Sequence, residues 1–274
     1  MYDFAYHQPT HLAQAAELLQ SDAEARLLAG GMSLLPSLKL RLARTPALID
    51  LGAIAPLAGI RHDAAMLALG AMTTHAAVAS SALVQSLVPG LARLAAGIGD
   101  PMVRNRGTVG GSVANADPAA DYPAAVLALD ALIVTQRREI AAQAFFTGLY
   151  ETALAPDEII TEVRFPVPRC AGYAKLRHPA SRFAVMGVMV ARSASDEVRV
   201  AVTGAGPRVF RVEAAEAALS RRFDPAALDE VSLDPVQLMA DIHGSAEYRA
   251  LCFRPLAKKA LADAVRSGGE RGQG

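Results

Sequence analysis

The spacing of apolar residues in the first fifty positions predicts a compact unit of short helices and strands. Residues 12–19 repeat apolar side chains at helical spacing, which favours one helix with a buried face. Farther along, apolar runs at 26–29 and 47–51 are typical of strands. Between them, 34–42 carries a helical pattern that begins just after a glycine pair. The predicted order after the first helix is therefore strand, loop, helix and strand.

The next hundred residues predict a second unit of mixed composition, which ends at Pro166-Val167-Pro168. A proline-rich segment after an apolar run is typical of a chain leaving a sheet, so we place a domain boundary at residue 168. The expected elements are strands at 57–61, 66–71, 131–136 and 159–165, and helices at 87–98 and 121–129.

Beyond residue 168 the pattern changes to three apolar runs joined by hairpin-length links, at 173–177, 185–192 and 198–204. Such runs predict three strands of an antiparallel sheet. Helical segments follow, and the longest spans 246–265. The last residues, 267–274, are rich in glycine and charge, so we expect a disordered tail.

Composition narrows the function. The chain has 27 basic and 27 acidic residues, a net charge of zero that argues against nucleic-acid binding. Its two cysteines, Cys170 and Cys252, are too few for a four-thiolate iron–sulfur cluster and do not suggest a secreted disulfide framework. The first residues resemble no signal peptide, and no apolar run reaches membrane-spanning length. We therefore expect a protein of the reducing cytoplasm that binds no metal itself and spans no membrane.

Two glycine pairs, Gly30-Gly31 and Gly110-Gly111, suggest where chemistry takes place. Each lies in a loop of small residues with a hydroxyl nearby. Glycine lets successive backbone N–H groups approach a phosphate closely, so two such loops could hold the diphosphate of a dinucleotide. Neither loop fits the Rossmann or P-loop pattern, and taken alone an ordinary turn explains either pair equally well.

The wider sequence around these pairs resembles a known family. The sequence A-G-G-M-S-L-L-P at 29–36 resembles the first FAD loop of the flavoprotein subunits of molybdenum hydroxylases, the carbon monoxide dehydrogenase and xanthine dehydrogenase family. The sequence R-G-T-V-G-G-S-V-A-N-A-D-P-A-A-D at 106–121 resembles the second FAD loop. The resemblance covers nearly the whole chain and is closest to carbon monoxide dehydrogenase medium subunit-like proteins.

This resemblance implies an α+β fold. It implies a two-lobed FAD-binding domain of the vanillyl-alcohol-oxidase-like type at 1–168, with lobes at about 1–54 and 55–168. A smaller flavoprotein domain at 169–266 would carry the three-stranded antiparallel sheet and helices. The implied FAD-binding residues are Leu28, Ala29, Gly30, Gly31, Met32, Ser33, Leu34, Ile98, Thr108, Val109, Gly110, Gly111, Ser112, Asn115, Asp121, Ile160, Lys175 and Phe183.

Several of these residues have a plain structural interpretation as well. Asp121 could cap the following helix, and Lys175 could be a surface lysine on an edge strand. Ile98 and Phe183 would by default belong to a core. Met32 departs from relatives that carry a polar residue there; a thioether donates no hydrogen bond, so the flavin environment is the property that this position changes.

The resemblance implies an oxidoreductase subunit that passes electrons from two [2Fe–2S] clusters on a small subunit, through FAD, to an external acceptor. Substrate would be oxidised at a molybdenum cofactor on a large subunit, and a dimer of heterotrimers is the implied assembly. Two alternatives stay open: a stand-alone flavin oxidoreductase of the same fold, or an assembly module that has lost FAD. The sequence offers no convincing catalytic acid or base.

Overall fold

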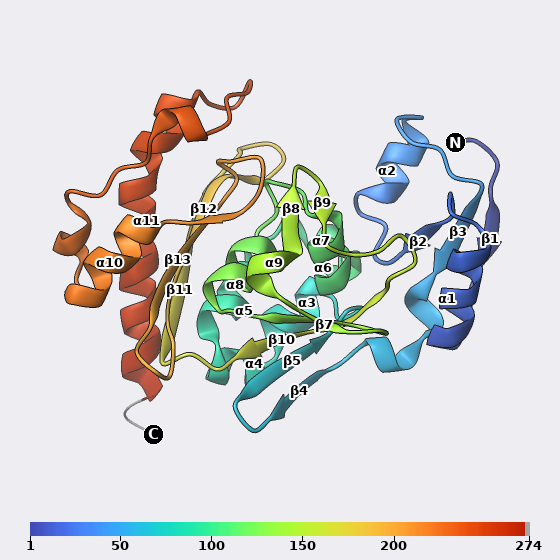
Figure 1. The fold of residues 1–274 in the computed structure, drawn as a ribbon, viewed down its shortest axis with the longest axis horizontal. Coiled ribbons are helices and arrows are strands. Elements are labelled where there is room, and N and C mark those ends of the chain that lie inside the picture. The colour runs from blue at the N-terminus through green and yellow to red at the C-terminus, as the bar shows by residue number, and fades with distance from the viewer. Residues whose placement is uncertain (272–274) are drawn as a thin grey trace.

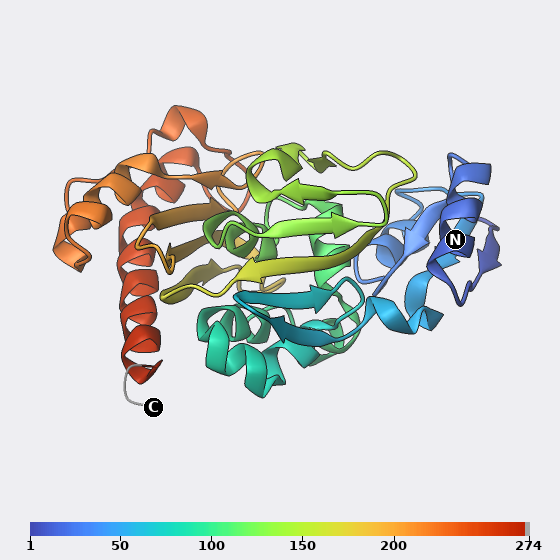
Figure 2. The same ribbon diagram turned by 60° about the horizontal axis from the view of Figure 1, so that its bottom comes forward.

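The computed structural model describes residues 1–271, which form three regions in a row (Figure 1). An N-terminal lobe and a C-terminal sheet lie at opposite ends of the molecule, with a five-stranded sheet and its helices between them (Figure 2). The mixture of helices with parallel and antiparallel sheets is the α+β architecture expected from the sequence. Within the described residues, no helix is long and apolar enough to cross a membrane.

The N-terminal lobe contains the predicted strand–loop–helix–strand unit. Its three strands form a parallel sheet in the order β1-β3-β2, which needs crossover connections such as the one that α2 provides. The helix α1 buries Ala15 and Leu19 against Ile49 of this sheet. The bounds are β1 (Ala5–His7), α1 (Leu12–Ser21), β2 (Arg26–Leu28), α2 (Leu34–Lys39) and β3 (Ala47–Asp50), followed by the 3-10 turns η1 (Leu51–Ala53) and η2 (Ala55–Leu57).

The central region is an antiparallel sheet in the order β4-β5-β10-β6-β7. Its core includes Leu67, Leu69, Val163 and Phe165, which alternate along paired strands as a half-buried sheet requires. The strand expected at 57–61 begins later, because η2 ends at Leu57. The strand bounds are β4 (Ile60–Asp63), β5 (Met66–Gly70), β6 (Leu132–Thr135), β7 (Glu139–Ala141), β8 (Phe146–Gly148), β9 (Glu151–Thr152) and β10 (Ile160–Pro166).

Helices pack against this sheet and supply the rest of the central core. The glycine-rich segment after residue 107, expected to be a loop, forms the helix α7. Its N-terminus is stabilised because the Thr108 hydroxyl accepts a hydrogen bond from the Gly111 N–H at 3.1 Å. The bounds are α3 (His75–Ser80), α4 (Ala82–Leu87), α5 (Pro89–Ala96), α6 (Pro101–Arg106), α7 (Val109–Asn115), α8 (Tyr122–Ala128) and α9 (Ala142–Phe145).

The C-terminal sheet has four strands in the order β11-β12-β13-β14. The three predicted strands are present, but the expectation of a three-stranded sheet is wrong, because the short β14 pairs with β13. The long helix α11 continues to Arg271, past the point where a disordered tail was expected; residues 272–274 of that tail lie outside the described residues. The bounds are β11 (Cys170–Arg177), β12 (Ala184–Arg192), β13 (Val198–Thr203), β14 (Phe210–Arg211), α10 (Glu213–Arg221), η3 (Pro225–Leu228), η4 (Pro235–Gln237) and α11 (Ala246–Arg271).

The two sides of β11 meet different parts of the molecule. Ala174 and Leu176 pack into the cluster that includes Phe253 and Leu261 of α11. Residues of opposite parity, among them Tyr173, pack instead on the central core. This alternation follows from the two-residue period of a strand and turns polar side chains of β11 toward the middle of the molecule.

Candidate cofactor site

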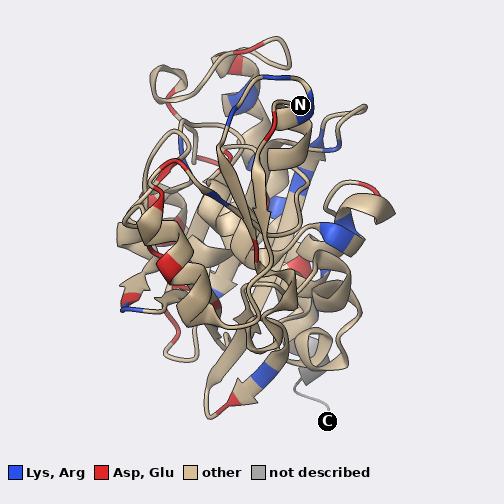
Figure 3. Ribbon diagram, turned by 90° about the vertical axis from the view of Figure 1, so that its right-hand side faces the viewer, with Lys and Arg blue, Asp and Glu red and all other residues tan. Residues whose placement is uncertain are grey.

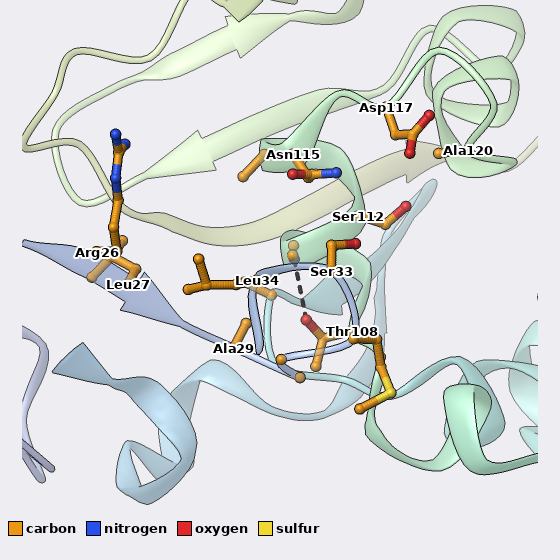
Figure 4. A pocket seen from close by; sticks show the side chains of 18 of the residues that line it. Arg26, Leu27, Ala29, Ser33, Leu34, Thr108, Ser112, Asn115, Asp117 and Ala120 are labelled. Atoms are coloured by element: carbon orange, nitrogen blue, oxygen red, sulfur yellow. Dashed lines mark hydrogen bonds between the residues drawn. The ribbon is translucent and has the colours of Figure 1, made fainter. Parts of the chain in front are cut away.

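A cavity of about 790 Å³ brings both glycine pairs together (Figure 4). Its walls come from the N-terminal lobe, the central helices α6 and α7, and the loop between β11 and β12. The volume lies within the usual range for cofactor and ligand pockets. Every predicted site residue lines this cavity except Leu28, Val109 and Lys175.

The first glycine pair is needed for close contact between the two loops. A Cβ atom added to Gly30 would lie 2.1 Å from the backbone oxygen of Arg106, so only glycine fits there. Gly31 has a φ of +74°, a left-handed conformation that glycine adopts without strain. The physical reason for both glycines is thus the path of the chain, which lets loop 29–34 lie directly against the start of the second loop.

Loop 29–34 leaves its backbone donors available. Within the part of the chain that the structure describes, the N–H groups of Gly30, Gly31, Met32 and Ser33 make no hydrogen bond to a protein acceptor. Their residues all line the cavity. Backbone N–H groups are strong donors that require an acceptor, so this loop can bind an anion or another acceptor in the cavity.

The second loop differs from the sequence expectation. Its N–H groups already donate to the protein: Val109 to the Thr73 oxygen at 3.0 Å, Gly110 to the Ala71 oxygen at 2.8 Å, and Ser112 to the Thr108 oxygen at 3.0 Å. The prediction that both glycine pairs offer successive free amides is therefore wrong for Gly110-Gly111. The reason is local: this segment is a capped helix whose start is tied to the segment after β5.

The second loop offers side chains to the cavity in place of backbone N–H groups. Ser112 and Asn115 of α7 line the cavity, and Figure 4 draws them near Ser33 of the first loop. Neither polar group makes a hydrogen bond to another described residue. A hydroxyl and a carboxamide can each donate and accept, so they suit the hydroxyl and phosphate groups of a nucleotide.

Asp121 does not serve as the helix cap that the sequence allowed, because its side chain makes no capping hydrogen bond to α8. Instead it accepts from the Tyr173 hydroxyl at 2.6 Å and from Lys175 Nζ at 2.9 Å. Lys175 lies on the edge strand β11, yet its side chain is only 3% exposed. The surface-lysine interpretation is therefore wrong, and Lys175 reaches the cavity only through Asp121.

The other predicted residues occupy different depths. Ile98 lines the cavity while packing against the central core, and Ile160 opens β10 at the cavity wall. Phe183 is 46% exposed at the cavity, so it is no core residue. Val109 is fully buried in the core beneath the second loop, and Leu28 is half-buried at the end of β2. Neither Val109 nor Leu28 lines the cavity, so both would act by packing rather than by contact with a ligand.

Sequence reasoning did not single out His75 and Asp117, two of the titratable residues that line the cavity. Burial, and to a lesser degree the Arg104 charge, lower the pKa of His75 to about 4. Its backbone N–H donates to the Gly107 oxygen at 3.0 Å, so it supports the second loop. Burial raises the pKa of Asp117, whose carboxylate accepts from the Ala119 N–H at 2.9 Å. Asp117 lies within the motif at 106–121, so its position in that motif could have indicated a role at the site. His75 is isolated in the sequence, and no motif around it indicates one.

The cavity carries positive charge suited to an anionic ligand. Arg26, Arg44 and Arg182 line it. Of the acidic lining residues, Asp121 and Glu158 pair with Lys175 and Arg138, and only Asp117 has no basic partner among the described residues. Along the rest of the ribbon, basic and acidic residues are both spread over several elements (Figure 3). A basic cavity in a neutral protein concentrates an anionic ligand at the site.

Comparison with known proteins identifies the family. The model of the FAD binding domain in molybdopterin dehydrogenase matches residues 2–168. The nicotine 6-hydroxylase medium subunit of Paenarthrobacter nicotinovorans is 36% identical over 94% of this chain and 96% of its own. The carbon monoxide dehydrogenase medium chain of Hydrogenophaga pseudoflava is also 36% identical, over 94% of this chain and 96% of its own.

The fold agrees with these sequence relationships. A solved structure of carbon monoxide dehydrogenase from Hydrogenophaga pseudoflava, which lacks the Mo-pyranopterin moiety of the molybdenum cofactor, superimposes with a TM-score of 0.88. That match has 36% identity and covers 97% of this chain and 98% of the other. The chain therefore belongs to the family of FAD-binding medium subunits of molybdenum hydroxylases, and it is an FAD-carrying electron-transfer subunit of an oxidoreductase.

Proposed function

We propose that this subunit holds FAD in the cavity between its lobes, with the first loop on the diphosphate. Bound FAD supplies the redox chemistry, while the protein supplies position and charge. The observation that carries the proposal is the set of free N–H groups on 30–33, placed in a cavity lined by arginines. Because a diphosphate is an acceptor with two negative charges, it matches both features.

The remaining parts of the cofactor would be held by the other predicted residues. Ser112 and Asn115 offer donors and acceptors for the second side of the diphosphate and for the ribityl chain. Asp121 offers a carboxylate for a hydroxyl group. Ile98, Ile160 and Phe183 supply apolar surface for the rings, as a cofactor pocket of mostly apolar lining requires. Val109 and Leu28 would support these groups from beneath.

The family resemblance also implies partner subunits. We propose that a small subunit with [2Fe–2S] clusters delivers electrons to the cavity, and that a large subunit with the molybdenum cofactor oxidises the substrate. An external acceptor then takes the electrons, and two heterotrimers form the complete cytoplasmic enzyme. This chain has only two cysteines, whereas one cluster needs four ligands, so the clusters would lie on another subunit. We further propose a domain division at residue 168.

The experiment that tests this proposal is purification of the chain alone, followed by its visible spectrum. We expect the absorption bands of an oxidised flavin, and release of stoichiometric FAD when the protein is denatured. A colourless protein that takes up no added FAD, either alone or reconstituted with both partner subunits, would favour the assembly module. Substrate turnover by the isolated chain would instead favour the stand-alone oxidoreductase.

A further inference from the structure

A buried polar cluster joins the cofactor cavity to the C-terminal sheet. Its members are Asp121, at the start of α8, and Tyr173 and Lys175, two residues apart on β11. The Tyr173 hydroxyl donates to Asp121 Oδ1 at 2.6 Å. Lys175 Nζ lies 2.8 Å from Oδ1 and 2.9 Å from Oδ2. The side chains of the ion pair are 5% and 3% exposed, so water does not screen it.

The fold provides the space that this cluster needs. Tyr173 and Lys175 point to the same side of β11, as residues i and i+2 of a strand do. Gly187 faces Lys175 across the ladder, and a Cβ atom there would lie 2.2 Å from the Tyr173 hydroxyl. The neighbouring strand therefore leaves room for the phenol to reach Asp121.

The carboxylate of Asp121 has an acceptor position without a donor among the described residues. An ionised carboxylate has about four acceptor positions, and the two partners on β11 supply three close contacts. No other described side chain or backbone group donates to it. Asp121 also lines the cavity. One acceptor position is thus left for a donor in the cavity, and a flavin nucleotide carries hydroxyl donors on its ribityl chain and on its adenosine ribose.

Building on the proposed function, we propose that Tyr173 and Lys175 are positioning residues that hold Asp121 ionised and aimed at a sugar-type hydroxyl of the flavin nucleotide. They act from the C-terminal sheet, outside residues 2–168 that the family model matches. The C-terminal domain thereby contributes to cofactor binding through a residue of the FAD domain. Tyr173 has no place in either glycine loop, which is why the motif did not reveal it.

The electrostatics of the cluster agree with this role. Burial raises the pKa of Asp121, and Lys175 and Tyr173 oppose that rise. The exposed Arg177, also on β11, acts in the same direction, whereas Tyr122 of α8 stays neutral because burial raises its pKa. Loss of the Tyr173 hydroxyl would remove one of the groups that keep the carboxylate ionised, so Asp121 would take up a proton at higher pH.

The test is the pH profile of FAD affinity, measured by titrating the apoprotein of the full chain with FAD. For Tyr173→Phe we expect the decline of affinity on acidification to begin at a higher pH than in the wild type, and affinity near neutrality to fall roughly tenfold. Asp121→Asn should bind weakly without this pH dependence. Tyr248→Phe is the matched control, since Tyr248 lies on α11 and is 46% exposed. It should leave the profile unchanged.

Tyr173→Phe keeps the ring and its packing, so it tests the hydroxyl without a large risk to folding. A wild-type profile in Tyr173→Phe, together with wild-type affinity, would overturn this inference while leaving FAD binding intact. Failure of the wild-type chain to bind FAD would overturn the proposed function instead. Titration with FMN assigns the donor: an equal loss for FMN points to the ribityl chain, and a loss for FAD alone points to the adenosine ribose.

Discussion

The two glycine loops look alike in sequence but offer different chemistry in the fold. In the first loop, the N–H groups of 30–33 have no acceptor among the described residues, and these four residues line the cavity. The second segment is a helix whose early N–H groups are already bonded, so it presents the side chains of Ser112 and Asn115 instead. A glycine pair therefore does not by itself define an anion-binding backbone. Such a pair can bind an anion through its backbone only if its N–H groups have no acceptor within the protein.

The glycines themselves also differ in purpose. Gly30 and Gly110 are required because another part of the backbone approaches too closely for any side chain. Gly111 is less restricted: its added Cβ would meet the Thr108 hydroxyl at 2.9 Å and Ala29 Cβ at 3.3 Å. The motif thus records how the two loops pack on each other and on β5 as much as how they bind a ligand.

The largest combined effect, on both folding and FAD binding, is expected from Gly30→Ala. The new methyl group would meet the Arg106 carbonyl oxygen at 2.1 Å, and backbone cannot move aside as a side chain can. We expect the loops to separate, the free energy of unfolding to fall by about 2 kcal/mol or more, and FAD to be lost during gel filtration. Chemical denaturation and the flavin absorbance measure both.

Gly52→Ala serves as its control in the same lobe. There the nearest atom is a side-chain oxygen of Asp50 at 3.0 Å, which can shift. This variant should retain FAD and most of its stability. If Gly30→Ala also retained both, the two loops would not depend on each other for their placement.

Acid should act at the second loop rather than the first, because the buried His75 imidazole lies against Gly107, whereas no titratable side chain occurs in 29–34. Burial lowers the pKa of His75 from 6.5 to about 4, so the unfolded chain binds a proton that the folded chain refuses. This contribution is complete above pH 6.5 and is lost as the pH falls toward 4. It amounts to roughly 3 kcal/mol.

Urea denaturation of the apoprotein between pH 7.5 and pH 4.5 measures that loss. His75→Gln should show a shallower decline than the wild type over the same range, although it is less stable at neutral pH. Parallel curves for the two proteins would mean that other groups produce the acid sensitivity. Comparing the difference between the curves, rather than either curve alone, removes the contribution of the remaining carboxylates.

Much of the fold and of the site could be predicted from local patterns. Strands β2 and β3 and the helix between them follow from apolar spacing, and the cavity lining follows largely from the two motifs. Long-range partners could not be predicted this way. The pairing of Asp121 with Tyr173 and Lys175 joins positions more than fifty residues apart, and nothing in the pattern around Asp121 distinguishes it from a helix cap.

The same reason explains the error at Gly110. Its N–H finds the Ala71 oxygen only because β5 ends beside α7, which is a property of the tertiary structure. The short β14 could not be predicted, because its two residues, Phe210 and Arg211, are too few to show a periodic pattern. Predictions from sequence were thus most accurate where a residue interacts with its near neighbours in the chain.

A moderate effect is expected at the side chains of α7. Asn115→Ala removes a carboxamide that lines the cavity and has no partner among the described residues, so the folded apoprotein should lose little stability. FAD affinity should fall roughly tenfold, the effect of losing a hydrogen bond to a charged or polar ligand. Ser112→Ala should act in the same direction. Isothermal titration of the apoprotein with FAD gives the affinities, and unchanged values for both variants would remove α7 from the binding surface.

The smallest effect is expected from Ser33→Ala, and it tests the comparison most directly. Ser33 lines the cavity from the first loop, where binding should depend on backbone N–H groups that alanine retains. Its substitution should change FAD affinity less than threefold, well below the effect of Ser112→Ala on the chemically identical side chain. Equal losses in the two serine variants would show that both loops bind through hydroxyls. A larger loss at Ser33 would reverse the assignment, because the first loop would then depend on its side chain and its free amides would need another acceptor.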